Sequence, residues 1–518
     1  MNQSNNLPAV LRSLVIYAIC IPLAVWLGYI IAQQWDRSTF GILGVMALVL
    51  AAPIFLRWHQ PILILSWNLG MVIFFIPGTP NIWMPMVCLS LGISVLHRAL
   101  NNEVRFISAP QITWPLISLA AVVLFTAEMT GGIGLRSFGS DAVGGRRYFT
   151  VLVAIMGYFA LTARRIPPKR AGLYVAIFFL AGCTSVIGDS IVFLPSAFNF
   201  IFAFFPANVY ALSNGINTDF SVTRFSGVGM MAMAIFFFML ARYGIRGIFM
   251  SGRPGRLLFF LLFSVLVLMG GFRMSLITCI LIFAIQFYLE RLHQTKLLMV
   301  FIFMGLIMAT LSVPFADKLP ASFQRSLAFL PLKIDPEVKA NADDSSNWRL
   351  IMWSAVLPQV PQYLLLGKGY KLSALDYQMV TTKGLAGLSA ADWSSAIVGN
   401  FHNGPLSVVI FFGIWGVIAV VWFWTACVRA LYDNYRYGDP SLRIANTFLF
   451  TYFVVKIIVF LFVFGALESD MLGFVGLIGL SISLNGGIRH PAKSPVQEAE
   501  TRPIPAPNQP RFQPYYQQ

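Results

Sequence analysis

Long apolar stretches separated by short polar segments run along the chain from about residue 13 to residue 485. A stretch of about 20 apolar residues can cross a bilayer as a helix, because helical hydrogen bonding satisfies its backbone there. The pattern predicts an all-α polytopic membrane protein with about 14 transmembrane helices, in a range of about 12 to 14. The stretch 190–206 is apolar too, but its prolines predict an interfacial or re-entrant piece. The predicted spans are 13–32, 39–56, 61–77, 80–97, 112–129, 147–163, 171–188, 226–243, 257–272, 274–289, 296–315, 405–426, 444–464 and 471–485.

The spans and the segments between them divide the chain into four parts. Residues 1–315 hold predicted transmembrane helices 1 to 11, and residues 405–488 hold helices 12 to 14. Residues 316–404 between them form one long periplasmic loop with short helices, and loops of this length are usually functional. Residues 489–518 are rich in Pro and Gln, which is typical of a disordered cytoplasmic tail.

Basic residues fall in alternate loops along the chain. Because loops rich in Lys and Arg face the cytoplasm in multi-pass proteins, this distribution predicts that both termini lie inside and the loop 316–404 lies outside. The basic residues of the predicted inner loops are Arg57, Arg98, Arg105, Arg164, Arg165, Lys169, Arg170, Arg242, Arg246, Arg253, Arg256, Arg291, Lys296, Arg429, Arg436 and Arg443.

Composition narrows the class of protein. Of the 518 residues, 58% are hydrophobic and 11% are charged, whereas about a quarter are charged in soluble domains. These values exclude a soluble globular protein and a disordered one. The 36 Lys and Arg outnumber the 20 Asp and Glu, which leaves a net charge of +16. A basic excess can indicate nucleic acid, but here it lies in the cytoplasmic loops and tail. We interpret it as a topology signal, so membrane lipid is expected as a partner and nucleic acid is not.

The sequence predicts neither a leader peptide nor a cofactor. The first apolar segment is too long for a signal peptide and lacks a small-residue cleavage site, so it is expected to remain as the first helix. The five cysteines lie within or at the ends of predicted spans, and no Cys-x-x-Cys spacing occurs, so no disulfide framework is expected. A nucleotide-binding glycine motif and a His-Glu-x-x-His motif are also absent from the sequence.

One histidine is a candidate for chemistry on the outer side. His59, His97, His293 and His490 fall on the predicted cytoplasmic side, and only His402 lies outside, where the long loop re-enters the membrane. Histidine is the side chain best suited to general-base work near neutral pH. The structural alternative is a histidine that helps to begin the incoming helix. The position of His402 favours a catalytic role.

Two arginines stand at the outer edges of predicted spans. Arg273 interrupts an apolar run, and Arg224 immediately precedes another span. Arginines at this depth are costly and are functional candidates, and a guanidinium matches phosphate oxygens through paired hydrogen bonds. Snorkelling toward lipid phosphate is the alternative for either residue. Two such arginines facing one cavity would suit a diphosphate.

The long loop carries a third candidate element. Arg349 and Trp353 are four residues apart and are predicted to share one face of a short helix. The turn Gly367-Lys368-Gly369 ends that unit. It is not a phosphate-binding P-loop, because the upstream glycine and the following Ser or Thr are absent.

Charged residues also occur within or beside the spans. Lys456 lies mid-span, and Glu128 lies near the outer end of its helix. The two could form a buried pair, a proton relay or a substrate contact, of which structural pairing is favoured. Glu468-Ser469-Asp470 could bind a metal, but two carboxylates with no nearby histidine are a weak signal. No metal site is expected.

Four motifs follow one another along the outer side. They are Arg224-Phe225-Ser226-Gly227, Gly271-Phe272-Arg273-Met274-Ser275, Arg349-x-x-x-Trp353 with Gly367-Lys368-Gly369, and His402-Asn403 with Gly413-Ile414-Trp415-Gly416. In this order they resemble the Arg-x-x-Gly, Gly-Ser-Arg-Gly, Arg-x-x-x-Trp…Gly-x-Gly and His-Asn…Gly-x-x-Gly elements of the O-antigen ligase and polymerase superfamily of membrane glycosyltransferases. The resemblance covers residues 224–416.

The resemblance implies a metal-independent glycosyltransferase, without cofactor, in a bacterial inner membrane. Such enzymes take a glycan from undecaprenyl diphosphate at the periplasmic face and join it to a glycan or lipid-linked acceptor. By position, Arg224 and Arg273 would bind the diphosphate, and His402 would activate the acceptor hydroxyl. Arg349, with Trp353 and Asn403, would support the loop or the donor.

Departures from the family pattern bear on the acceptor. Gly229-Met230-Met231-Ala232 stands where family ligases often have Pro-Asn, and Phe272 and Met274 replace the usual small neighbours of the arginine. We favour a polymerase of exopolysaccharide or O-antigen repeat units. The alternative within the class is an O-antigen ligase that uses lipid A-core or a protein. The rival of another class is a lipid-linked oligosaccharide flippase, which Lys456 and Glu128 support and the single long loop opposes.

Overall fold

A computed structural model describes residues 37–101, 103, 105–134, 144–207, 224–372 and 401–491, with scattered positions between 14 and 32. In these residues every regular element is helical, and one isolated β-bridge joins Val72 and Asn81. The all-α prediction is therefore confirmed for this part of the chain. Much of the predicted first span 13–32, the loop segment 373–400 and the tail from residue 492 lie outside the described residues.

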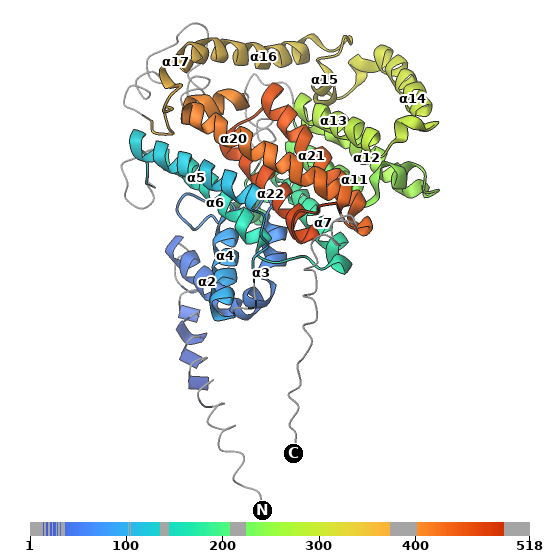
Figure 1. Cartoon of the computed structure of the whole chain (residues 1–518). Coiled ribbons are helices and arrows are strands. Elements are labelled where there is room, and N and C mark those ends of the chain that lie inside the picture. The colour runs from blue at the N-terminus through green and yellow to red at the C-terminus, as the bar shows by residue number, and fades with distance from the viewer. Residues whose placement is uncertain are drawn as a thin grey trace, which may run out of the picture.

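Helix α22 (Leu467–Asn485) forms the centre of the bundle. Every residue from Phe474 to Asn485 is buried. The helix packs against α6 (Gly145–Thr162), α20 (Gly404–Tyr437) and α21 (Arg443–Phe462). Further helices enclose this group (Figure 1): α4 (Trp83–Leu100), α5 (Pro110–Thr130), α7 (Ala171–Leu180), α11 (Ser226–Phe249), α12 (Pro254–Leu266) and α13 (Arg273–Leu289).

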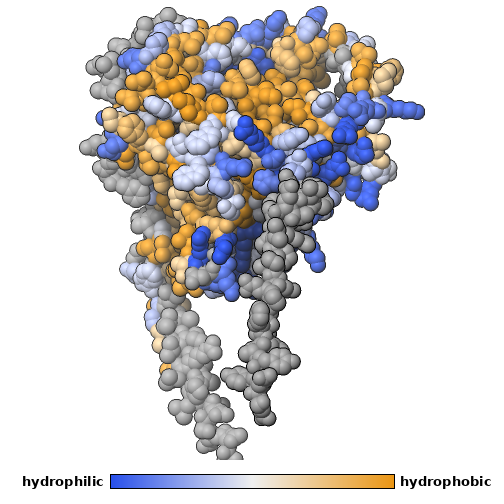
Figure 2. Space-filling view, in the orientation of Figure 1, coloured by the Kyte–Doolittle hydropathy of each residue, from blue (hydrophilic) through white to orange (hydrophobic). Residues whose placement is uncertain are grey.

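The outer faces of the bundle are apolar as well. On α20, Trp415, Ile418 and Trp422 are each about half exposed, and their spacing places them on one side of the helix. Hydrophobic residues cover much of the surface of the upper body in Figure 2. Helices that are apolar both toward the core and away from it fit a lipid environment. The chain is thus a multi-pass membrane protein.

Most predicted spans coincide with helices. Seven helical segments of the described chain are long and apolar enough to cross a membrane: Trp83–Leu100, Pro110–Thr130, Pro168–Val192, Ser226–Phe249, Gly404–Tyr437, Pro440–Phe462 and Leu467–Asn485. The spans predicted at 257–272, 274–289 and 296–315 are represented by shorter apolar helices, Pro254–Gly270, Arg273–Leu289 and Leu297–Ile307. The total of about 14 spans stays a prediction.

The pair of spans predicted at 39–56 and 61–77 differs from the structure. Helices α2 (Arg37–Leu50) and α3 (Ala52–Ser66) meet at a bend of 89°, so together they form at most one broken span. The second prediction was wrong, because the helix ends at Ser66. Trp67 Nε1 then donates to the carbonyl of Leu472 (3.1 Å), and Asn68 Nδ2 donates to that of Phe178 (2.8 Å). These two bonds attach the irregular segment after α3 to α22 and to α7.

The loop predicted at 316–404 contains a long polar helix. After α15 (Ala321–Leu327), α16 (Pro336–Val356) lies across one end of the bundle, at the top of Figure 1. The side chain of Asp335 caps α16 by accepting a hydrogen bond from the Glu337 N–H (2.8 Å). Residues at or just before the starts of α11, α13 and α20 contact α16.

Candidate functional site

Helix α16 brings together the two arginines that the sequence places at span edges. Arg224, just before α11, donates from Nη2 to Oδ1 of Asn341 (3.0 Å). Arg273, the first residue of α13, donates from Nη2 to the carbonyl oxygen of Ala342 and to Oγ of Ser346, both at 2.9 Å. Two arginines from separate helices therefore contact neighbouring residues of α16.

Arg325 in α15 is a third arginine of this cluster, and sequence reasoning missed it. Its side chain is buried, although arginine is rarely buried without a partner or function. Nε donates to the same Asn341 Oδ1 (2.8 Å), and Nη1 donates to the carbonyl oxygen of Gly271 (2.6 Å). Arg325 belongs to none of the four motifs, so only the folded chain reveals its place beside Arg224.

The turn before α13 explains the glycine in the second motif. Gly271 has a φ of 66°, in the left-handed region that favours glycine. A Cβ at this position would lie 3.3 Å from Cγ of Arg224, so the glycine also leaves room for the arginine stem. The turn thereby brings Arg224 and Arg273 close to the carbonyl oxygen of Gly271, which Arg325 binds.

His402 lies directly before α20 in a strained backbone conformation. Its φ is 49°, which is uncommon for a residue other than glycine and is found preferentially at functional sites. The next residue, Asn403, caps α20, since its Oδ1 accepts from the Leu406 N–H (3.0 Å). The imidazole packs against Trp348 and Phe464, with ring centroids 5.2 and 4.7 Å away.

Arg349 and Trp353 share one face of α16, as their spacing predicts, and both approach His402. Cζ of Arg349 lies 5.9 Å from the centroid of the Phe464 ring, which also contacts the imidazole. Nε1 of Trp353 donates to the carbonyl oxygen of Phe401 (2.8 Å). Trp353 thus fixes the residue before the histidine, whereas Arg349 contributes charge beside it.

The site is electropositive. Burial and, secondly, the nearby charge of Arg349 lower the pKa of His402 to about 4. Burial lowers the pKa of Arg349, and the charge of Arg273 lowers it further. Within the described residues, neither Arg273 nor Arg349 has a carboxylate at ion-pair distance. An anion bound here would relieve this concentration of positive charge.

Three buried polar atoms lie at the site beside and on His402. Nε1 of Trp348, Nε of Arg349 and Nδ1 of His402 are buried, and none has a hydrogen-bond partner in the part of the chain that the structure describes. Buried polar atoms in folded proteins nearly always have partners. Two donors and an imidazole nitrogen together can bind a polar, oxygen-rich molecule such as a sugar or a phosphate.

The two glycine motifs bind each other rather than a ligand. The turn Gly367-Lys368-Gly369 lies against a break in α20 at Gly413, where φ is 60°. At this break the N–H of Lys368 donates to the carbonyl of Ile410 (2.7 Å). The glycine motifs therefore fix the first turns of the helix that follows His402.

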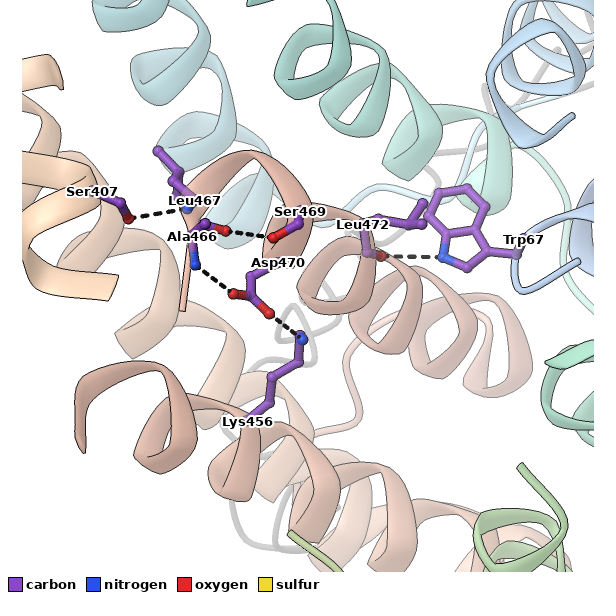
Figure 3. Close-up of polar contacts among 8 residues, drawn as sticks. All are labelled: Trp67, Ser407, Lys456, Ala466, Leu467, Ser469, Asp470 and Leu472. Atoms are coloured by element: carbon purple, nitrogen blue, oxygen red, sulfur yellow. Dashed lines mark hydrogen bonds and ion pairs between the residues drawn. The ribbon is translucent and has the colours of Figure 1, made fainter. Parts of the chain in front are cut away.

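Two ion pairs connect charged residues in and beside the spans. Nζ of Lys456 contacts Oδ1 of Asp470 at 2.6 Å (Figure 3), and Nε of Arg147 contacts Oε2 of Glu468 at 3.0 Å. Lys456 is paired, as favoured, but its partner is Asp470; the pair with Glu128 was wrong, because Glu128 is exposed on α5. The two acids considered for a metal thus each face a protein cation.

Comparison with known families agrees with these motifs. Residues 257–421 match the family model described as O-antigen ligase, which covers about a third of the chain. The matched segment contains Arg273, Arg349, His402 and both glycine motifs, whereas Arg224 lies before it. No curated protein matches the chain. The resemblance to the O-antigen ligase and polymerase superfamily is confirmed over this segment.

Proposed function

We propose that this protein is a membrane glycosyltransferase that polymerises oligosaccharide repeat units carried on undecaprenyl diphosphate. The transfer takes place at the periplasmic face of a bacterial inner membrane, in the synthesis of exopolysaccharide or O-antigen. The observation that carries the proposal is the convergence of Arg224, Arg273 and Arg325 on α16, next to His402 and its unpartnered neighbours.

The proposed reaction exchanges one bond for another at the anomeric carbon of the donor. The bond from this carbon to a diphosphate oxygen breaks, and the acceptor hydroxyl oxygen forms a bond to the same carbon. Negative charge therefore grows on the leaving undecaprenyl diphosphate. Guanidinium groups fixed by α16 stabilise that charge without having to reorganise, which is an effective form of catalysis. Arg224 and Arg273 bind the diphosphate, and Arg325 supports them from beneath.

His402 has a secondary role in this reaction. With a pKa of about 4, its imidazole is neutral at neutral pH, and in the tautomer protonated at Nε2 its Nδ1 accepts a hydrogen bond from the acceptor hydroxyl. It is a weak base, so Nδ1 takes the hydroxyl proton late, when the new bond has largely formed, and then passes that proton to solvent. Most of the rate enhancement consequently comes from the arginines that stabilise the leaving group.

Deletion of the gene tests the choice of polymerase. We expect loss of polymer, with single repeat units still attached to lipid A-core. Long lipid-linked polymer that never reaches its acceptor would contradict the polymerase and support the ligase. Repeat units retained on the cytoplasmic face would support the flippase instead.

The pH dependence of transfer tests the environment of His402. Wild-type activity should persist as the pH falls through 6.5 and be lost near pH 4, where the imidazole takes up a proton. Arg349→Gln removes the positive charge that helps to lower the pKa of His402, so the loss of transfer activity should move toward higher pH. Arg349→Lys keeps the charge and should leave the acid limit nearly unchanged.

Folding has to be followed in the same titration. The folded pKa of His402 lies below the ordinary value of 6.5, so the unfolded chain takes up this proton first as the pH falls. The free energy of unfolding therefore decreases between pH 6.5 and pH 4, and thermal unfolding should be recorded at each point. A wild-type acid limit near 6.5 in folded protein would contradict this view of His402.

A further inference from the structure

We propose that Lys456 and Asp470 are positioning residues for His402. Their ion pair fixes the turn between α21 and α22, residues 463–466, against which the imidazole rests. This inference rests on the proposed function, because it assigns the pair a role relative to His402. The proposal gives the ion pair between α21 and α22 a role in the rate of transfer.

The 463–466 turn contacts both His402 and the residues that follow it. The ring of Phe464 lies 4.7 Å from the imidazole, centroid to centroid. Gly465 and Gly404 touch through their backbones, since a Cβ on Gly465 would lie 3.0 Å from Cα of Gly404. A Cβ on Gly404 would overlap Phe460 at the end of α21. A movement of the turn would therefore move the start of α20 and the imidazole together.

Asp470 holds this turn from two directions. Its Oδ2 accepts a hydrogen bond from the Ala466 N–H (2.9 Å), and its Oδ1 contacts Nζ of Lys456 (2.6 Å), as Figure 3 shows. The neighbouring N–H of Leu467 donates to Oγ of Ser407 in the first turn of α20 (3.1 Å). The carboxylate of Asp470 thus closes the first turn of α22 and attaches this turn to Lys456 on α21. A separate hydrogen bond, from Leu467 to Ser407, attaches the same turn to α20.

The path of the Lys456 side chain is built into α22. A Cβ on Gly473 would overlap the end of the Lys456 side chain. Because glycine has no Cβ, the Lys456 side chain can pass beside α22 at this residue. Nζ then lies 5.3 Å from the centroid of the Phe474 ring, and the side chains of Lys456 and Asp470 are each only 18% exposed. In such surroundings the loss of one partner leaves the other charge poorly solvated. Removal of Lys456 should consequently displace Asp470 and the turn it holds.

A matched control is present at the opposite end of the same two helices. Asn446 on α21 and Asn485 on α22 exchange side-chain hydrogen bonds of 3.0 and 2.8 Å, and both are buried. Asn446→Ala therefore breaks a buried polar link between α21 and α22, and the bond from Asn446 Nδ2 to the carbonyl of Asn434 near the end of α20 (2.9 Å), all far along the helices from the 463–466 turn. It separates general loosening of the helix pair from a specific effect on His402.

The variants to compare are Lys456→Met, Lys456→Arg and Asp470→Asn. Lys456→Met should lower kcat about 10- to 100-fold, because small displacements of a reacting group have effects of this size. KM for the lipid-diphosphate donor should change little, since the arginine cluster is untouched. Lys456→Arg should restore most of kcat. Asp470→Asn can still accept from the Ala466 N–H, so it tests the ion pair in a chain whose first α22 turn is capped.

The chemical reactivity of His402 provides a second measurement, which does not require glycan transfer. Diethyl pyrocarbonate modifies neutral imidazole, and peptide mass spectrometry separates His402 from the other histidines. The charged group facing the imidazole from α16 is Arg349, while the 463–466 turn presents Phe464. Loosening the turn admits water, so the pH at which His402 becomes reactive should rise in Lys456→Met. It should stay unchanged in Asn446→Ala.

Three outcomes decide between the possibilities. Normal kcat and an unshifted His402 profile in Lys456→Met and Asp470→Asn would overturn the positioning role. Equal losses in Lys456→Met and Asn446→Ala would also overturn it, because the pair would then act only through stability. A wild-type protein that transfers no glycan contradicts the proposed function alone, since the modification of His402 still tests the positioning.

Discussion

Replacing Arg273 with alanine is expected to lower the rate of glycan transfer by about 10³- to 10⁵-fold, as in enzymes that lose an arginine from a phosphate-bearing transition state. Arg273 lies where its charge is felt by Arg349, and no carboxylate in the described chain neutralises it. In the proposed reaction, its charge is therefore available to the leaving diphosphate. Alanine removes the charge and the hydrogen bonds to α16 together.

Two further variants separate charge from geometry at this position. Arg273→Lys keeps the charge but loses the planar fork that matches phosphate oxygens, so its activity should fall between wild type and alanine. Ser346→Ala removes one hydrogen-bond partner of Arg273 and leaves the guanidinium in place, so its loss should be smaller still.

Complementation of the deletion strain, with immunoblots of membrane protein, provides the measurement for these variants. Arg146→Ala is the matched control, because Arg146 is an exposed arginine of the same predicted outer side. If cells that carry Arg273→Ala made as much polymer as wild type, Arg273 would not be part of the site.

Replacing His402 with alanine should lower transfer by about 10²- to 10⁴-fold, the usual contribution of an acid or base. We expect a smaller loss than for Arg273→Ala, because an imidazole with a pKa of about 4 is a weak base at neutral pH. Membrane levels of the variant should remain normal, since the capping of α20 depends on Asn403.

The backbone at His402 allows a sharper comparison. Its φ of 49° is strained for alanine but ordinary for glycine. His402→Gly should therefore be more stable than His402→Ala, by about 1 kcal/mol, and equally inactive. Thermal unfolding in detergent measures the stability difference, and a transfer assay measures the loss of activity. His97→Ala, which alters an exposed histidine on the predicted cytoplasmic side, should behave as wild type. Full activity in His402→Gly would show that the imidazole is dispensable.

The sequence predicted the helices well because apolar segments of sufficient length leave the chain few alternatives in a bilayer. It failed at 61–77, where side chains of Trp67 and Asn68 satisfy carbonyls of distant helices and allow irregular backbone. Such long-range bonds leave no periodic signal in the chain.

The residues predicted for the site, whose roles stay predictions, could be found from the sequence for similar reasons. Arg224, Arg273, Arg349 and His402 stand at span edges or in spaced motifs, so their positions already suggested a function. Arg325 has no such context, and its importance follows from burial against residues far away in the sequence. The partner of Lys456 was likewise beyond reach, because Glu128 and Asp470 are equally plausible until the helices are packed.

Transfer by the purified protein from a synthetic undecaprenyl diphosphate oligosaccharide, in the presence of a metal chelator, measures the proposed reaction most directly. We predict lengthened lipid-linked glycan, with one undecaprenyl diphosphate released for each new glycosidic bond, in the wild type and not in Arg273→Ala. Movement of the intact lipid across the bilayer with no new glycosidic bond would contradict the proposal.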